Sequence, residues 1–298
     1  MTREAMSDPR IDRDQQVVRE RGSGPRMSRL GLTPTSDAHR WHVHVHDQVA
    51  TSTGALHGGC GFGAAVEAMV ATIGRPLVWA TAQFVAHAAV GTVLDLEVNP
   101  VVQGYRVTQA RASIAHGGHE VLTAVGTFGT REFPIEHTWV RPPDVPAPSD
   151  CPPHERGREV LLDAWQGRTA LGRFPEELDG RPGSGRSAAW YRLPEGRRMV
   201  GPGDLAVLGD FLLLDLSDAV GHRVTGNSLD NTLRMGIPAA TEWVLVDTQV
   251  SLLARGFGSV QAHLWSDDGV LLGIAAQTMI VRSVGSDGRP IRTTKRYA

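Results

Sequence analysis

Two stretches of the chain are long and mainly apolar, and each is followed by shorter segments in which apolar residues partly alternate with polar ones. The first run, Ala55–Ile73, is rich in Gly and Ala and predicts a helix that is buried on most sides. The second run, Asp204–Val220, predicts a corresponding helix. In the strand-like segments apolar residues partly recur at every second position, as at Val260, Ala262 and Leu264, so one sheet face should meet a core.

The segments after the two helices match in number and order. Both series contain a Gly-bearing turn between their last two strands, at His116–Gly118 and at Asp267–Gly269. The expected strands are Leu77–Ala86, Val93–Val102, Tyr105–Ile114 and Val121–Phe128, and then Asn227–Met235, Trp243–Leu253, Ser259–Trp265 and Val270–Val281. The pattern predicts an internal duplication in which each half wraps one helix in a curved antiparallel sheet.

A Pro-rich segment, Arg141–Pro153, separates the halves and is typical of a linker. The tails at both ends are polar and should be mobile. We therefore expect an N-terminal tail over residues 1–38, a first domain over 39–133, a linker segment over 134–180, a second domain over 181–283 and a C-terminal tail over 284–298.

Composition and charge narrow the classes of protein. The 298 residues include 30 Lys+Arg and 32 Asp+Glu, for a net charge of −2, which argues against nucleic acid as the main partner. The two cysteines, Cys60 and Cys151, lack the spacing of a disulfide framework or a zinc site. Without a signal-peptide core or a run of about 20 apolar residues, we expect a cytoplasmic protein with no membrane span.

Several short motifs identify a family by their order and spacing. The duplicated pattern resembles the hotdog fold, and over roughly residues 45–283 the chain resembles the tandem acyl-CoA thioesterase II family. The motifs are Leu56-His-Gly-Gly59, Asn227-Ser-Leu-Asp-Asn231, Glu242-Trp-Val-Leu-Val-Asp247, Ala254-Arg-Gly-Phe-Gly258 and Asp268-Gly-Val-Leu-Leu-Gly-Ile-Ala-Ala-Gln-Thr278. The resemblance implies an α+β double hotdog that hydrolyses acyl-CoA thioesters.

The resemblance also implies a catalytic trio of Asp, a hydroxyl and Gln in the second half, which holds and activates a water. By position these residues are Asp210, Ser228 and Gln277. Ser228 stands where some relatives have Thr, which keeps the hydroxyl. The following Asp230-Asn231 departs from a common Asp-His.

The residues themselves leave alternatives to this assignment. Asp210 lies in an apolar stretch, and a buried carboxylate needs a partner or a function. From the residues alone, a partly exposed helix residue like Asp215 or Asp218 is the favoured alternative, and the resemblance reverses that preference. Gln277 could be a strand glutamine with satisfied hydrogen bonds, and Ser228 could cap or turn the chain.

Gly58 and Gly59 open the first helix, where backbone N–H groups could bind the developing oxyanion or position the acyl group. The alternative is that these glycines let the helix pack inside its sheet. A second candidate base is Glu67, because single-hotdog thioesterases often pair an HGG-type helix start, here at His57, with a carboxylate further along that helix.

Three alternating histidines, His42, His44 and His46, could line one face of a strand, but no acidic or Cys set completes a metal site, so a solvated face is favoured. The leading hypothesis is an acyl-CoA hydrolase that needs no cofactor or metal and forms a homo-oligomer. The alternative is a non-catalytic acyl-CoA or lipid-binding double-hotdog protein. A hotdog hydratase would need an Asp and His pair at hydratase spacing, which the helix-bearing segments lack.

Overall fold

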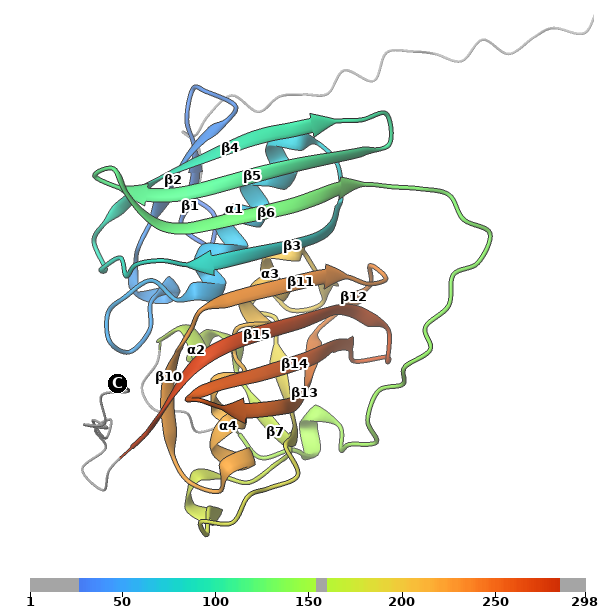
Figure 1. The fold of residues 1–298 in the computed structure, drawn as a ribbon. Coiled ribbons are helices and arrows are strands. Elements are labelled where there is room, and N and C mark those ends of the chain that lie inside the picture. The colour runs from blue at the N-terminus through green and yellow to red at the C-terminus, as the bar shows by residue number, and fades with distance from the viewer. Residues whose placement is uncertain (1–26, 154–159, 285–298) are drawn as a thin grey trace, which may run out of the picture.

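The computed structural model describes residues 27–153 and 160–284, and its main feature is one large antiparallel sheet of thirteen strands (Figure 1). The strands are β1 (Leu32–Pro34), β2 (Arg40–His44), β3 (Leu77–Phe84), β4 (Val93–Gln103), β5 (Val107–His116), β6 (His119–Gly129), β7 (Arg168–Leu171), β8 (Arg186–Arg192), β9 (Arg198–Met199), β10 (Val224–Ser228), β11 (Asp230–Met235), β12 (Ala240–Thr241), β13 (Trp243–Ala254), β14 (Phe257–Ser266) and β15 (Leu271–Ser283). The helices are α1 (Gly58–Ile73), α2 (Val160–Trp165), α3 (Pro202–Leu208) and α4 (Leu213–Val220), with 3-10 turns η1 (Asp47–Val49), η2 (Pro148–Asp150) and η3 (Pro175–Glu177). β9 and β12 form a separate two-stranded sheet.

The strand order is symmetric about its centre, which confirms the predicted duplication. It runs β1-β2-β4-β5-β6-β3 in the first half and β11-β15-β14-β13-β8-β7 in the second, with β10 added beside β15. At the centre β3 pairs with β11, where Thr81 lies opposite Thr232 and their Oγ atoms are 2.8 Å apart. The two halves therefore share one continuous sheet, with the helices on its inner side (Figure 1).

Helix α1 is the buried helix that the Gly/Ala-rich run predicts. It starts after His57 and ends at Gly74, which has a left-handed backbone conformation with φ of 68°. Glycine adopts this helix-ending conformation without steric cost because it has no Cβ. Its small residues let it lie close to β3, β4, β5 and β6 and to α3 of the other half. Ala64, Ala65 and Ala68 are fully buried. α1 therefore belongs to the core of both halves.

The second predicted helix, Asp204–Val220, is not one helix. It breaks between α3 and α4, where the backbone N–H groups of Asp210 and Phe211 donate to carbonyls three residues earlier, at 3.1 and 3.2 Å, and so tighten the turn. Gly209 lies so close to β15 that a Cβ there would be 2.8 Å from the Cβ of Ala275. Packing against the sheet thus ends α3 and leaves Asp210 on the turn that follows it.

Helices and strands also occur in the segments that the sequence predicts to be tail and linker. β1 lies within the expected tail 1–38, and α2 and β7 lie within the expected linker 134–180. β7 extends the sheet by pairing with β8. The Pro-rich segment after β6 follows the outside of the molecule to the second half (Figure 1). Residues 1–26 and 285–298 of the expected tails lie outside the described residues.

Candidate active site

A buried carboxylate lies where the two halves meet. Asp210 is 7% exposed, and its two oxygens accept hydrogen bonds from three elements that are distant in sequence. Oδ2 accepts from the backbone N–H of Gly59 at 2.5 Å. Oδ1 accepts from Ser228 Oγ at 3.0 Å and from the side-chain amide of Gln277. The structure thus brings the sequence-predicted Asp210, Ser228 and Gln277 into direct contact.

The sheet register explains why these side chains converge. β10 runs antiparallel to β15, with Ser228 opposite Met279. Gln277 lies two residues before Met279 on β15, so both point to the same inner face. Met279 is fully buried and Gln277 is 2% exposed, which identifies that face as the core side beneath the turn that carries Asp210.

The predicted glycines permit the close approach of α1 to this carboxylate. A Cβ on Gly59 would lie 2.7 Å from the Cβ of Asp210, and a Cβ on Gly58 would lie 2.9 Å from Asp210 Oδ2 and from the ring of Phe84. Real Cβ atoms do not come so near other heavy atoms. The Gly59 N–H is used by Asp210 here, and the first turn of a helix offers further N–H groups without intrahelical partners.

His57 also faces this carboxylate, which the sequence interpretation missed by pairing it with Glu67. Its Nδ1 lies 3.4 Å from Asp210 Oδ2, and its ring packs edge-on against Phe211 with centroids 5.5 Å apart. The HGG start of α1 therefore meets the carboxylate of the opposite half. The only sequence signal for this contact was the position of His57 immediately before Gly58.

Glu67 lies elsewhere, in a cluster of buried charges at the start of α3. A Cβ on Gly203 would collide with the side chain of Glu67, just as a Cβ on Gly59 would collide with Asp210. Burial and the nearby charge of Asp204 raise the pKa of Glu67 to about 7. Asp204 itself binds Arg29 and Arg198. Burial alone would raise the pKa of Asp204, but these arginines outweigh it and hold that pKa below its ordinary value.

The first half does not repeat the polar partners of Asp210. Thr81 and Thr232 face each other in the central strand pair and are equivalent positions of the two halves. Counting from them along the paired strands, Ser228 corresponds to Leu77 and Gln277 to Gly126. The ring of Phe128 lies against Gly126, where a Cβ would be 3.0 Å from the ring. Neither Leu77 nor Gly126 has a side chain that can donate a hydrogen bond, so the polar trio is formed in the second half.

Two buried amide oxygens near the site have no hydrogen-bond partner among the described residues, namely Gln277 Oε1 and Asn231 Oδ1. Asn231 is fully buried, and its amide donates to the carbonyl of Ala206 at 3.3 Å. Buried acceptors are normally satisfied by protein or by water. The free oxygen of Gln277, next to Asp210, is therefore suited to accept a hydrogen bond from a water molecule.

Two of the three alternating histidines contact different side chains, whereas the buried Nε2 of His46 has no hydrogen-bond partner among the described residues. His44 Nε2 lies 3.1 Å from Thr33 Oγ1, and His42 Nδ1 lies 3.4 Å from Asp95 Oδ1. Within residues 27–153 and 160–284, no group of three or more His, Cys, Asp or Glu side chains could hold a metal ion. In the same ranges no helix is long and apolar enough to cross a bilayer.

Comparison with protein families matches both halves. Residues 46–129 match the acyl-CoA thioesterase N-terminal domain, and residues 139–281 match the acyl-CoA thioesterase C-terminal domain. The chain belongs to the acyl-CoA thioesterase family, and its two halves are the two hotdog units that the sequence predicts. Family and fold support thioesterase activity in general. No curated protein matches the chain.

Several solved structures share the whole fold. A protein from Novosphingobium aromaticivorans, solved as a candidate thioesterase, is 32% identical, with a TM-score of 0.75 over 84% of this chain and 98% of that one. An Alicyclobacillus acidocaldarius protein with a hot dog fold is 19% identical, with a TM-score of 0.74 over 86% and 97%. An acyl-CoA thioesterase II, TesB2, from Mycobacterium marinum is 18% identical, with a TM-score of 0.68 over 87% and 98%.

Proposed function

We propose that the protein hydrolyses fatty or related acyl-CoA thioesters to the free acid and CoA, with Asp210 as the general base. The observation that carries this proposal is the buried carboxylate of Asp210, which accepts hydrogen bonds from Ser228, Gln277 and the start of α1. A buried, hydrogen-bonded carboxylate at a helix N-terminus is a costly arrangement that packing alone does not require.

The proposed reaction needs only a water and groups of this chain. Each carboxylate oxygen can accept more than one hydrogen bond, so Asp210 can also accept one from water. The free amide oxygen of Gln277 supports the same water as a second acceptor. Asp210 removes a proton while the water oxygen attacks the thioester carbonyl carbon.

The developing negative charge on the carbonyl oxygen needs donors, and we assign these to backbone N–H groups in the first turn of α1, at Gly58 and Gly59. For Gly59 to take part, its N–H must turn from Asp210 to the substrate. Collapse of the intermediate breaks the carbon–sulfur bond, and the proton taken by Asp210 returns to the CoA thiolate. No cofactor enters the cycle.

The biological setting is part of the proposal. A soluble enzyme of fatty acid metabolism in the cytoplasm fits the substrate class.

We propose a homodimer, because apolar side chains are exposed at equivalent ends of the two half-sheets. They are Val101 and Val102 on β4 and Leu252 and Leu253 on β13. Light scattering should give about twice the chain mass of 32.1 kDa, and a monomer at micromolar concentration would count against this.

The deciding experiment assays the purified chain with acyl-CoAs of graded length, reading released thiol, beside Asp210→Asn. The amide keeps the volume of the carboxylate but removes its charge. We expect kcat to fall about 10²–10⁴-fold at an unchanged fold, which is the usual size of a general-base contribution. Asp144→Asn, in the exposed Pro-rich segment, is the matched control and should keep parental turnover.

Equal turnover by Asp210→Asn and the parent would refute Asp210 as the base. If the protein binds acyl-CoA across the panel without releasing thiol, the non-catalytic acyl-CoA or lipid-binding function replaces the proposed one.

A further inference from the structure

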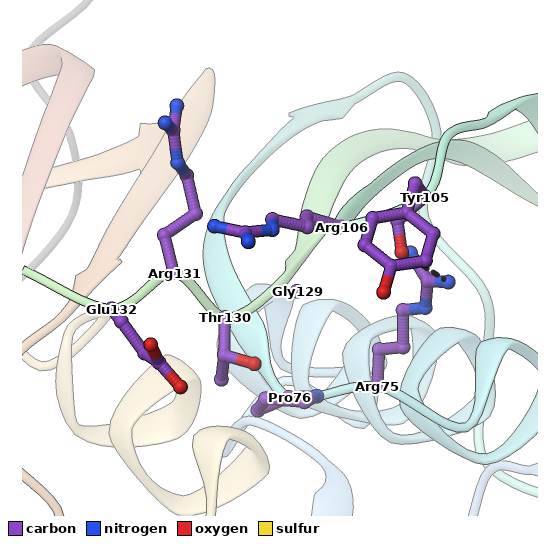
Figure 2. Close-up of a pocket in the computed structure, with 8 residues that line it drawn as sticks. All are labelled: Arg75, Pro76, Tyr105, Arg106, Gly129, Thr130, Arg131 and Glu132. Carbon is purple, nitrogen blue, oxygen red and sulfur yellow. Dashed lines mark hydrogen bonds between the residues drawn. The ribbon is translucent and has the colours of Figure 1, made fainter.

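A hollow lined by arginines lies at the opposite end of α1 from Asp210. Its volume is about 510 Å³, and its lining includes Arg75, Arg106 and Arg131 together with Tyr105 and Glu132. Figure 2 shows Arg75 and Tyr105 on one side of it and Arg131 and Glu132 on the other. The 16 residues of α1 span about 24 Å, so this hollow is separate from the buried carboxylate.

Hydrogen bonds to backbone carbonyls hold the segments around the hollow together. Arg75, which follows α1, donates to the carbonyls of Gly104 and Tyr105 at 3.0 and 3.3 Å. The N–H of Gly129 donates to the carbonyl of Pro76 at 2.9 Å. Gly129 has φ of 145° and lies so close to the carbonyl of Arg106 that a Cβ could not fit. The end of α1, the β4–β5 turn and the end of β6 are thus held in place.

The charges in the hollow are not neutralised within the described residues. Arg75, Arg106 and Arg131 have no carboxylate oxygen within 4.0 Å there, whereas eight other described arginines form ion pairs. With Glu132 the lining carries a net charge of +2 in a chain whose net charge is −2. Three guanidinium groups without carboxylate partners around one hollow attract anions.

We propose that this hollow binds the phosphate groups of a nucleotide. Its volume is in the range of small-molecule sites, and guanidinium groups bind phosphate oxygens in a planar, two-pronged geometry. Tyr105 is 93% exposed at the rim and offers an aromatic face to a base. Glu132 can accept from a sugar hydroxyl or an exocyclic amine, and Thr130 can donate a hydroxyl hydrogen bond.

The nucleotide could be a free ligand or the nucleotide end of CoA, and only the second source rests on the proposed thioesterase function. Binding of adenosine 3′,5′-bisphosphate to the full chain, measured by calorimetry, tests the shared chemistry. We expect saturable binding that weakens as NaCl is raised. Arg106→Gln combined with Arg131→Gln should raise Kd about tenfold or more, because two charge-assisted contacts are lost.

The matched control is Arg111→Gln, an exposed arginine on β5 outside the hollow, which should leave Kd unchanged. Arg106 and Arg131 are exposed, and unchanged melting curves for the double variant will verify its fold. No binding at millimolar bisphosphate, or equal binding by parent and double variant, would overturn the proposal.

The source is distinguished by kinetics with two thioesters of the same acyl group, one of CoA and one of N-acetylcysteamine, which has no nucleotide. A raised KM for the CoA thioester alone in the double variant supports the hollow as the site of the substrate's own nucleotide. Unchanged KM values together with lost bisphosphate affinity support a separate nucleotide ligand. If neither thioester is hydrolysed, the proposed function fails, and the calorimetry still decides the site.

Discussion

Asp210 illustrates how a single residue acquires its surroundings from distant parts of the chain. Its carboxylate accepts from Gly59, 151 residues earlier, and from Gln277, 67 residues later. Ser228 supplies a third hydrogen bond, and His57 lies beside the second oxygen. Each of these groups can reach the carboxylate only because the chain is folded, so changes at any of them should affect one shared function.

The first prediction concerns the two side chains that bond Asp210 Oδ1. Ser228→Ala and Gln277→Ala should each lower kcat, by about 10- to 100-fold, because each removes a group that orients the carboxylate and its water. The double variant should lose less than the product of the two, since both act on one water. Thr278→Ala, which removes a hydroxyl from the opposite face of β15, is the control for kcat measured by thiol release.

If the losses from Ser228→Ala and Gln277→Ala multiply exactly, the two residues act independently, and the shared-water interpretation is wrong.

The second prediction uses the buried Glu67. Its pKa is about 7 in the folded protein, against an ordinary value of 4.5, because burial and Asp204 disfavour its charge. Between these pH values the folded state binds more protons than the unfolded state, so Glu67 makes stability fall as pH rises from about 4.5 to 7. Glu67→Gln should therefore match the parent at low pH and exceed it at pH 8, by about 1–3 kcal/mol.

Denaturant unfolding at pH 5 and pH 8 measures this difference, with the exposed Glu120→Gln as a control that should show no such trend. A Glu67→Gln variant whose free energy of unfolding stays parallel to that of the parent across this range would show that Glu67 titrates normally.

At the scale of elements, the meeting of α1 with the turn after α3 forms the candidate site. Glycines at the first turn of α1 allow the backbone to approach Asp210, while Gly209 allows the turn to approach β15. The closest neighbours of a Cβ on Gly59 include the carbonyl oxygen of Ala206 and the Cα of Val207, both at 3.0 Å. Backbone atoms cannot move aside as a side-chain end can, so this contact should tolerate no added methyl group.

The third prediction follows from that contact. Gly59→Ala should separate α1 from the end of α3, lowering stability by about 1–3 kcal/mol and kcat by about tenfold or more. Gly61→Ala is the matched change on the same helix, because its Cβ would meet only the side-chain ends of Leu56 and Leu122, at 3.2 and 3.4 Å. Alanine also favours the helix over glycine, so Gly61→Ala should be near neutral. Thermal melts and thiol-release assays on both variants provide the comparison, and equal behaviour would contradict the packing argument.

At the scale of the whole molecule, the two halves form one folding unit. β3 and β11 pair along Asp230–Arg234 and Trp79–Gln83, and α1 packs against α3 across the same boundary. Removing one half would leave the β3 edge unpaired and the buried glycine-rich face of α1 exposed. Neither half therefore contains its own complete core.

The fourth prediction tests this dependence. A fragment of residues 27–133 should self-associate or aggregate, because another copy is the available partner for its open β3 edge and exposed helix. Size-exclusion chromatography with light scattering, run beside the full chain, measures the outcome. A fragment that stays monomeric at micromolar concentration and melts cooperatively would show that the first half folds alone.

The sequence by itself determined the features that depend on local periodicity. The Gly/Ala-rich run predicted α1, the alternating segments predicted strands in both halves, and their repetition predicted the duplication. Hydrophobic patterning records which face of each segment is buried, so it is readable without knowing the partner. The family resemblance selected Asp210, Ser228 and Gln277, whose catalytic roles stay predictions.

The tertiary structure alone decided which buried faces meet. It placed His57 and Gly59 in contact with Asp210 and not with Glu67. It also broke the second predicted helix at Gly209, which lies close to β15. It also joined the halves through β3 and β11. Such contacts depend on shape complementarity between segments separated by up to 151 residues, and no local pattern in the chain specifies which of several apolar faces will pack together.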